Sequence, residues 1–128
     1  MVDVTALYAA LLAALFIWLS FRVIQYRGTA SVSLGDGGDV TLTRRIRAQA
    51  NCAEYAPIGV TLLALLELSS TPGWALHLLG LTLLSGRLAH GLALSVTAKN
   101  APLRIGGMIA TFAMLALSSL GLFYVALF

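Results

Sequence analysis

The sequence predicts an all-α integral membrane protein folded as a single four-helix bundle, and three observations support this prediction. Of the 128 residues, 59% are hydrophobic and only 10% are charged, with a mean hydropathy of +0.92. A soluble domain would carry roughly 25% charged residues, because its surface faces water. The apolar residues also fall into four stretches long enough to cross a bilayer. Finally, the connections between these stretches differ strongly in charge.

The charges and the cysteine content exclude several other classes of protein. The eight lysines and arginines give a net charge of +3, but they are spread along the chain and form no patch interleaved with aromatic residues. We therefore expect no nucleic-acid partner. The single cysteine, Cys52, excludes an internal disulfide and a CxxC metal or redox site. His77 and His90 lie far apart in the sequence and form no metal-ligand pair, so we expect no metal.

We expect one domain over residues 1–128, with membrane-spanning helices that need about 20 residues each. The first apolar stretch has no basic segment before it and is longer than a signal-peptide core, so it is predicted to be a retained helix. The break "SSTPGW" separates the second helix from the third, and Pro102 suits the first turn of the fourth. The helices are expected at residues 4–26, 44–68, 74–97 and 103–127.

Positive charges concentrate on the first and third connections. The long first connection, residues 27–43, begins with Arg27 and leads into further arginines, while the third holds Lys99 and leads to Arg104. The second connection and the C-terminus carry no charge. The positive-inside rule therefore places both termini outside and the two basic connections in the cytoplasm. The first connection contains a "GDGG" turn and is either a functional lid or a disordered strap; we favour the strap.

A polar face interrupts the second helix. At 100° per residue, Arg47, Asn51, Glu54 and Tyr55 fall within one arc of about 100°. The apolar stretch after Tyr55 is too short to span a bilayer alone, so this face must point toward protein or a wet cavity. Arg87, near the middle of the third helix, needs a partner, and Glu54 at similar depth is the candidate for a structural ion pair. The polar face is then either a packing network or a pocket for an anion.

The segment "RIRAQANCAEYAP", supported by "RLAHGL" at 87–92 and "RIGGM" at 104–108, resembles the signature of the membrane-associated eicosanoid and glutathione metabolism (MAPEG) family. That family includes microsomal glutathione transferases, leukotriene C synthase, prostaglandin E synthase and a non-enzymatic lipoxygenase-activating protein. The short loops and the short C-terminus resemble those of a bacterial member, which implies an inner-membrane protein.

The resemblance implies a homotrimer that binds glutathione between neighbouring subunits near the cytoplasmic side. The residues that match the family's glutathione contacts are Arg47, Gln49, Asn51, Glu54, Tyr55, Ser20 and Arg27. Gln49 points away from the others on its helix, as it would if it served the adjacent subunit's site. Arg104 aligns with the arginine that activates the thiol in the synthases, and is the implied catalytic residue. His90 stands where the synthases have a glutathione-contacting tyrosine, and Leu94 replaces another, so no lipid-specific substrate is implied.

The chemistry of glutathione fits these residue types. Glutathione carries two carboxylates and one ammonium group, so arginines and one acid suit it. Its thiol, with a pKa of about 8.5, is mostly protonated at pH 7, and a guanidinium nearby stabilises the nucleophilic thiolate. The bilayer would supply an apolar electrophile or lipid hydroperoxide. We therefore expect a detoxifying transferase or peroxidase, with two alternatives: a non-catalytic glutathione- or lipid-binding protein of the same fold, and a small four-helix transporter that uses Glu54.

Overall fold

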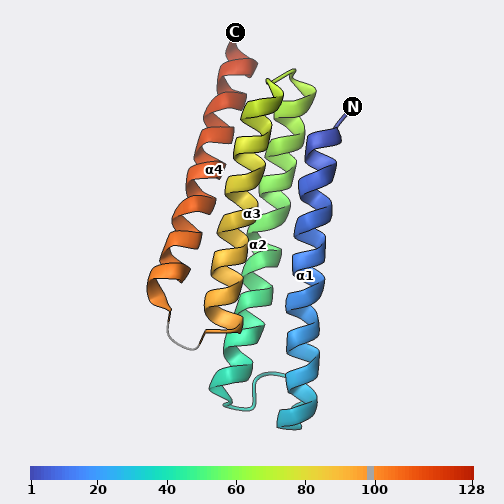
Figure 1. Cartoon of the computed structure of the whole chain (residues 1–128), viewed down its shortest axis with the longest axis vertical. Coiled ribbons are helices and arrows are strands. Elements are labelled where there is room, and N and C mark those ends of the chain that lie inside the picture. Colours follow the sequence, from blue (N-terminus) through green and yellow to red (C-terminus); the bar gives the residue numbers. More distant parts are fainter. Residues whose placement is uncertain (98–99) are drawn as a thin grey trace.

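A computed structural model describes residues 1–97 and 100–128 of the chain, and it confirms the all-α four-helix fold. The helices are α1 (Asp3–Ala30), α2 (Val40–Leu68), α3 (Gly73–Ser95) and α4 (Ala101–Leu127). Both termini lie at the same end of the bundle as the turn between α2 and α3, and the α1–α2 loop lies at the opposite end (Figure 1). Lys99, expected in the second basic connection, lies outside the described residues.

Three helices of the described chain, namely α1, α3 and α4, are long and apolar enough to cross a membrane. Helix α2 has 29 residues, but its first half carries Arg44, Arg45, Arg47 and Glu54. By length and composition, the described residues therefore give three candidate spans where the sequence led us to expect four. The charged half of α2 is the part that builds the site described below.

The first connection is shorter than predicted because both flanking helices are longer. The Asp39 side chain accepts a hydrogen bond from the backbone N–H of Leu42 (2.9 Å), which caps α2 so that it begins at Val40 and not at 44. Helix α1 continues to Ala30 and ends at Ser31, which has a left-handed φ of 54°. The loop therefore covers residues 31–39, not 27–43.

Hydrogen bonds order this loop, so the expectation of a disordered strap is wrong. The Asp36 carboxylate accepts from the N–H of Gly38 (3.0 Å) and from the hydroxyl of Thr43 (2.8 Å), and both bonds lower the pKa of Asp36. The Arg27 guanidinium donates to the carbonyl of Gly35 (2.7 Å). Gly35 has a φ of +69°, a conformation that glycine adopts without strain.

The third connection also begins and ends at places different from those predicted. Helix α3 ends at Ser95, two residues before the expected end, and Arg22 of α1 donates to both the hydroxyl and the carbonyl of Ser95 (2.6 Å each). Helix α4 begins at Ala101, two residues early, because the Asn100 side chain accepts from the N–H of Leu103 (3.0 Å) and caps it. The end of α3 and the start of α4 therefore lie at the same end of the bundle as the α1–α2 loop (Figure 1).

Two glycines let α3 and α4 approach closely beside the site. A Cβ atom at Gly86 would lie 2.9 Å from the carbonyl oxygen of Gly107, and a Cβ at Gly107 would lie 2.6 Å from the carbonyl oxygen of Gly86. Small residues at a helix crossing allow this backbone contact in membrane proteins. Since Arg87 follows Gly86 directly, the crossing also fixes where Arg87 and His90 meet α4.

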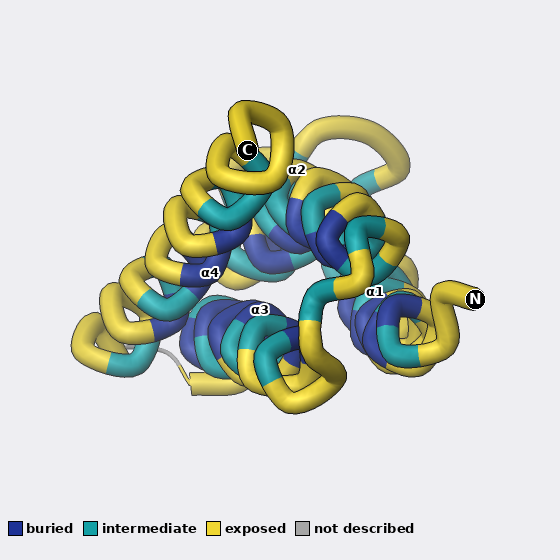
Figure 2. The backbone as a smooth tube through the Cα atoms, turned by 90° about the horizontal axis from the view of Figure 1, so that it is seen from above, coloured by how far each residue is buried: buried dark blue, intermediate teal, exposed yellow. Residues whose placement is uncertain are grey.

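Viewed along the bundle, α2 and α3 separate α1 from α4, and no contact joins α1 to α4 among the described residues (Figure 2). The core at the end that holds the termini contains Tyr8, Leu63, Leu83 and Met114. Large apolar side chains cover the outer surface, for example Phe112 of α4, which is exposed. Such a surface suits lipid or a neighbouring subunit and does not suit water.

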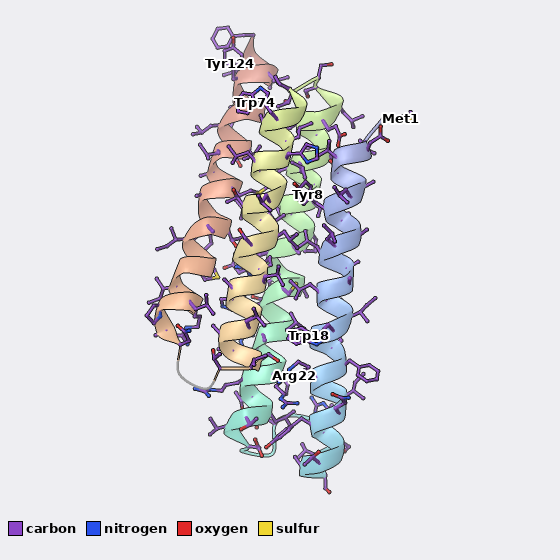
Figure 3. The ribbon with its side chains drawn as sticks, viewed as in Figure 1. Met1, Tyr8, Trp18, Arg22, Trp74 and Tyr124 are labelled. Carbon is purple, nitrogen blue, oxygen red and sulfur yellow. The ribbon has the colours of Figure 1, made fainter. Side chains whose placement is uncertain are left out.

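The end that holds the termini has a polar clasp that the sequence did not lead us to expect. The Glu67 carboxylate at the end of α2 accepts from the N–H groups of Val4 (2.9 Å) and Thr5 (2.7 Å), so it caps α1. Tyr8 of α1, labelled in Figure 3, donates to the carbonyl of His77 on α3 (3.1 Å). The clasp ties α1 to α2 and α3 at the end opposite the basic residues.

Candidate anion-binding cleft

Arg87 is the centre of the polar network between α2, α3 and α4. Its side chain is 1% exposed, and its Nε donates to the hydroxyl of Thr111 on α4 (2.9 Å). Its Nη1 donates to the side-chain oxygen of Asn51 on α2, and its guanidinium lies 5.2 Å from the ring centroid of Tyr55. These contacts arise because Asn51 and Tyr55 are four residues apart and share one face of α2.

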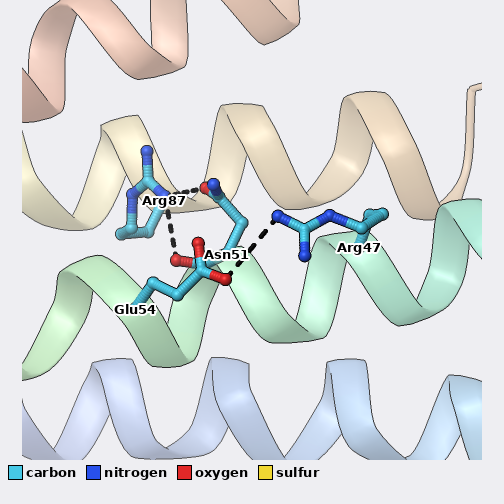
Figure 4. Close-up of polar contacts among 4 residues, drawn as sticks. All are labelled: Arg47, Asn51, Glu54 and Arg87. Carbon is cyan, nitrogen blue, oxygen red and sulfur yellow. Dashed lines mark hydrogen bonds and ion pairs between the residues drawn. The ribbon is translucent and has the colours of Figure 1, made fainter.

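The predicted ion pair between Glu54 and Arg87 is wrong. Within the described residues, no carboxylate lies within ion-pair distance of Arg87, and Glu54 instead pairs with Arg47 (3.6 Å; Figure 4). Residues 47 and 54 are seven apart, so they lie on one side of α2 about two turns apart, and long side chains can bridge that span. The Arg87 guanidinium already donates to Asn51 and Thr111, with further contacts to Gly107 and Met108. The Glu54 side chain, in contrast, is 52% exposed.

A cleft opens beside this network, between the polar half of α2, the end of α3 and the start of α4. One part has a volume of about 460 Å³ and is lined by Thr43, Arg44, Arg47, Ala93, Leu94, Asn100, Ala101 and Arg104. An adjoining part of about 290 Å³ is lined by Arg47, Asn51, His90, Leu94 and Arg104. The two parts share Arg47, Leu94 and Arg104, so they form one cleft of the size that small-molecule sites have.

The charge of the cleft is positive. Its described lining holds three arginines, namely Arg44, Arg47 and Arg104, and no carboxylate. Two carboxylates lie beside it: Glu54 is held against Arg47 at the rim, and Asp36 accepts a hydrogen bond from the hydroxyl of the lining residue Thr43 (2.8 Å). Guanidinium groups grip carboxylates and phosphates through paired hydrogen bonds, so the cleft is suited to an anion with more than one acidic group.

Four of the residues singled out in the sequence meet in this cleft: Arg47, Asn51, His90 and Arg104. Glu54 lies at its rim through its ion pair with Arg47. Tyr55 is not part of the lining, and its ring lies near the Arg87 guanidinium (5.2 Å) and in edge contact with the Phe112 ring (5.6 Å between centroids). Arg104 reaches the cleft from the first turn of α4, which Asn100 caps.

Besides Glu54 and Tyr55, three further predicted residues do not line the cleft of this chain. Gln49 points to another side of α2, as its place in the helix predicts, and Ser20 lies half-buried on α1. The Arg27 guanidinium holds the α1–α2 loop through the carbonyls of Gly35 and Val32 (2.7 and 3.4 Å). Within this chain, Arg27 therefore has a structural role in the loop and does not line the cleft.

The structure adds cleft residues that sequence reasoning missed, chiefly Arg44, Thr43 and Asn100. Arg44 was detectable, because it precedes Arg47 by three residues and so shares its face of the helix. Asn100 had the signal of a helix cap directly before Pro102. Thr43 had no comparable signal, since its position depends on α2 starting at Val40.

Comparison with known proteins agrees with this architecture. The model of the MAPEG family matches residues 5–124. The inner membrane protein YecN of Escherichia coli, in strain K12 and in an O6:H1 strain, is 41% identical over 87 residues. That alignment covers 68% of this chain and 66% of YecN, slightly less than two thirds of the relative. The family match covers nearly the whole length of the chain, and the four helices with a cleft on the polar second helix agree with it. The chain therefore belongs to the MAPEG family of integral membrane proteins.

Proposed function

We propose that the protein is a glutathione-dependent transferase or peroxidase whose cleft binds glutathione and holds its thiol as a thiolate. The observation that carries the proposal is the three-arginine lining of the cleft, with the half-exposed carboxylate of Glu54 beside Arg47 at its rim. The other acid at the edge, Asp36, already accepts from Gly38 and Thr43. Glutathione has two carboxylates for the arginines and one ammonium group for Glu54. An anion with no ammonium group would leave Glu54 without a role in binding.

Arg104 is the group that we assign to thiol activation, and Arg87 is not. Arg104 is exposed on the cleft wall at the start of α4, where the helix N-terminus adds a favourable field for an anion. Arg87 is buried and already donates to Thr111 and Asn51. The thiolate attacks the electrophilic carbon of an apolar second substrate, the carbon–sulfur bond forms as the leaving group departs, and the thiol proton passes to water.

A homotrimer would complete this site. Gln49, Ser20 and Arg27 match the family's glutathione contacts but lie away from the cleft of their own chain. In a trimer, Gln49 of one subunit would face the cleft of its neighbour, with Ser20 and Arg27 beside it. The exposed apolar surfaces of the bundle would then face partly the neighbouring subunits and partly lipid.

We place the protein in the bacterial inner membrane, as the name of YecN states for that relative, with both termini outside and the cleft toward the cytoplasm. In a Cys52→Ser background, cysteines introduced at Pro72 or Phe128 should react with an impermeant maleimide in intact cells. A cysteine at Ser33, an exposed residue of the α1–α2 loop, should react only after lysis. Labelling at Ser33 in intact cells would overturn the orientation and the cytoplasmic cleft.

The Arg47–Glu54 pair should matter for ligand binding and little for stability. The two side chains are 54% and 52% exposed, and an exposed pair contributes about 0–1 kcal/mol. Arg47→Ala and Glu54→Gln should therefore each weaken glutathione binding about tenfold or more, since each removes a charge-assisted contact, while assembly in detergent stays unchanged. If both variants dissociate, and substitutions at Arg87 restore assembly, the pair is structural.

Turnover with glutathione and chlorodinitrobenzene tests the proposed activity. Purified protein in detergent should release chloride and form the glutathione conjugate faster than the uncatalysed reaction, and an Arg104→Ala variant should lose most of that rate. Tight glutathione binding without turnover of this electrophile or of a lipid hydroperoxide would identify the protein as a non-catalytic binder of the same fold. Absence of glutathione binding would end both proposals.

A further inference from the structure

An apolar groove of about 380 Å³ lies between α1 and α3, apart from the cleft. It is lined by Leu11, Leu15, Trp18, Leu84, Leu88 and Leu92. Its walls are open to the outside of the bundle, since Trp18 is 37% and Leu88 is 38% exposed. From Leu11 to Trp18 the groove follows α1 for about 10 Å, at 1.5 Å per residue. This shape suits part of one extended acyl chain.

A cationic group closes the groove at the end nearer the α1–α2 loop. Arg22 lies one helical turn beyond Trp18 on α1, with its guanidinium 5.3 Å from the centroid of the Trp18 ring (Figure 3). It is held there by Ser95, which lies one turn beyond Leu92 on α3. The order along the groove is therefore apolar wall, tryptophan and arginine, which is the order of acyl chain, interface and headgroup in a bilayer.

A second guanidinium lies beside the first, and neither forms an ion pair among the described residues. Arg45 of α2 donates to the backbone carbonyl of Arg22 (3.0 Å) and stacks on the Tyr26 ring (4.6 Å). Its Nε is buried without a hydrogen-bond partner in the described part of the chain. The nearby Asp39 carboxylate is already engaged by the N–H of Leu42 and the hydroxyl of Tyr26.

We propose that this groove is a binding site for an anionic phospholipid, with one acyl chain along α1 and α3 and the phosphate at Arg22 and Arg45. Charge complementarity selects this occupant, because its phosphate supplies an anion to two guanidinium groups that have no carboxylate partner among the described residues. The phosphate accepts from the guanidinium groups, and the Trp18 ring lies at the level of the headgroup. The proposal does not depend on glutathione binding in the cleft.

Quenching of Trp18 fluorescence by brominated lipids tests this site directly. The protein has two tryptophans, so a Trp74→Phe variant leaves Trp18 as the only one. In mixed bilayers, phosphatidylglycerol brominated on its acyl chains should quench Trp18 half-maximally at a mole fraction about tenfold lower than the mole fraction of brominated phosphatidylcholine that is needed. The reason is that only phosphatidylglycerol adds a net negative charge at the arginine pair. This comparison requires no change at Arg22.

Two further variants separate the groove from general attraction of anionic lipid to a basic surface. Arg22→Gln should bring the half-maximal mole fractions of the two lipids together, whereas Arg44→Gln, which removes the same charge at the same end of the bundle but in the cleft, should retain the preference. Equal quenching by both lipids in the Trp74→Phe protein would overturn the proposal. No quenching by either lipid would also overturn it, since the groove would then be covered by protein.

Discussion

Arg104→Ala is expected to bind glutathione within a few fold of wild type and yet lose the ultraviolet absorbance of the bound thiolate at pH 7. Lowering the thiol pKa by about 2 requires roughly 2.7 kcal/mol of preferential thiolate stabilisation. One charge-assisted hydrogen bond from a guanidinium is of that order. The thiolate fraction would fall from a majority to a few per cent without Arg104, and turnover at pH 7 should fall about tenfold or more.

The pH dependence gives a second readout for Arg104. With its thiol pKa returned to about 8.5, the variant should regain thiolate absorbance and rate as the pH rises through that value. Arg44→Ala is the matched control, because Arg44 lines the outer part of the same cleft and does not line the part next to Asn51 and His90. Arg44→Ala should weaken binding but keep the thiolate at saturation. Full thiolate absorbance in Arg104→Ala, together with its loss in a folded Arg87 variant, would reverse the assignment.

Arg87→Ala is expected to destabilise the protein by about 3–5 kcal/mol, far more than Arg47→Ala. The reason is that Arg87 is 1% exposed and fills the space between three helices. Its removal leaves a cavity and deprives the Asn51 side-chain oxygen of its donor from α3. Thermal unfolding in detergent, followed by helical circular dichroism, measures the loss. Weaker glutathione binding should accompany it, since Arg87 holds Asn51 at the cleft.

Arg87→Met separates packing from hydrogen bonding at the same position. Methionine restores much of the volume and removes a buried charge that has no carboxylate partner among the described residues. It should therefore be more stable than Arg87→Ala, although Asn51 would still lose its donor. A stability of Arg87→Ala within 1 kcal/mol of wild type would contradict the role that we assign to this residue.

The number and order of the four helices were predictable, because long apolar stretches separated by polar or proline-containing breaks mark them in the sequence. Helix ends were less predictable, because they depend on single capping contacts. Asp39 and Asn100 each accept a backbone N–H and so start α2 and α4 earlier than hydropathy suggested. Both are residue types that favour this position, so closer attention to capping would have found them. The ordered conformation of the α1–α2 loop likewise depends on a single side chain, because the Asp36 carboxylate accepts hydrogen bonds from Gly38 and Thr43.

The polar face of α2 was also predictable, since helical periodicity alone places Arg47, Asn51 and Tyr55 together. The partner of Arg87 was not. Similar depth in the membrane suggested Glu54, but depth says nothing about the direction in which each side chain leaves its helix. That direction follows from the close approach of α3 and α4 at Gly86 and Gly107, which turns Arg87 toward Thr111 and Asn51.

The calorimetric titration of the purified protein with glutathione tests the central claim most directly. The three-arginine cleft predicts saturable binding to the wild type, binding at least tenfold weaker in Arg47→Ala, and competition by glutathione analogues that keep both carboxylates but lack the thiol. Binding should also weaken as salt rises, because the contacts are ionic. No saturable heat with the folded wild type, or equal affinity in the Arg47→Ala protein, would contradict the assignment of the cleft to glutathione.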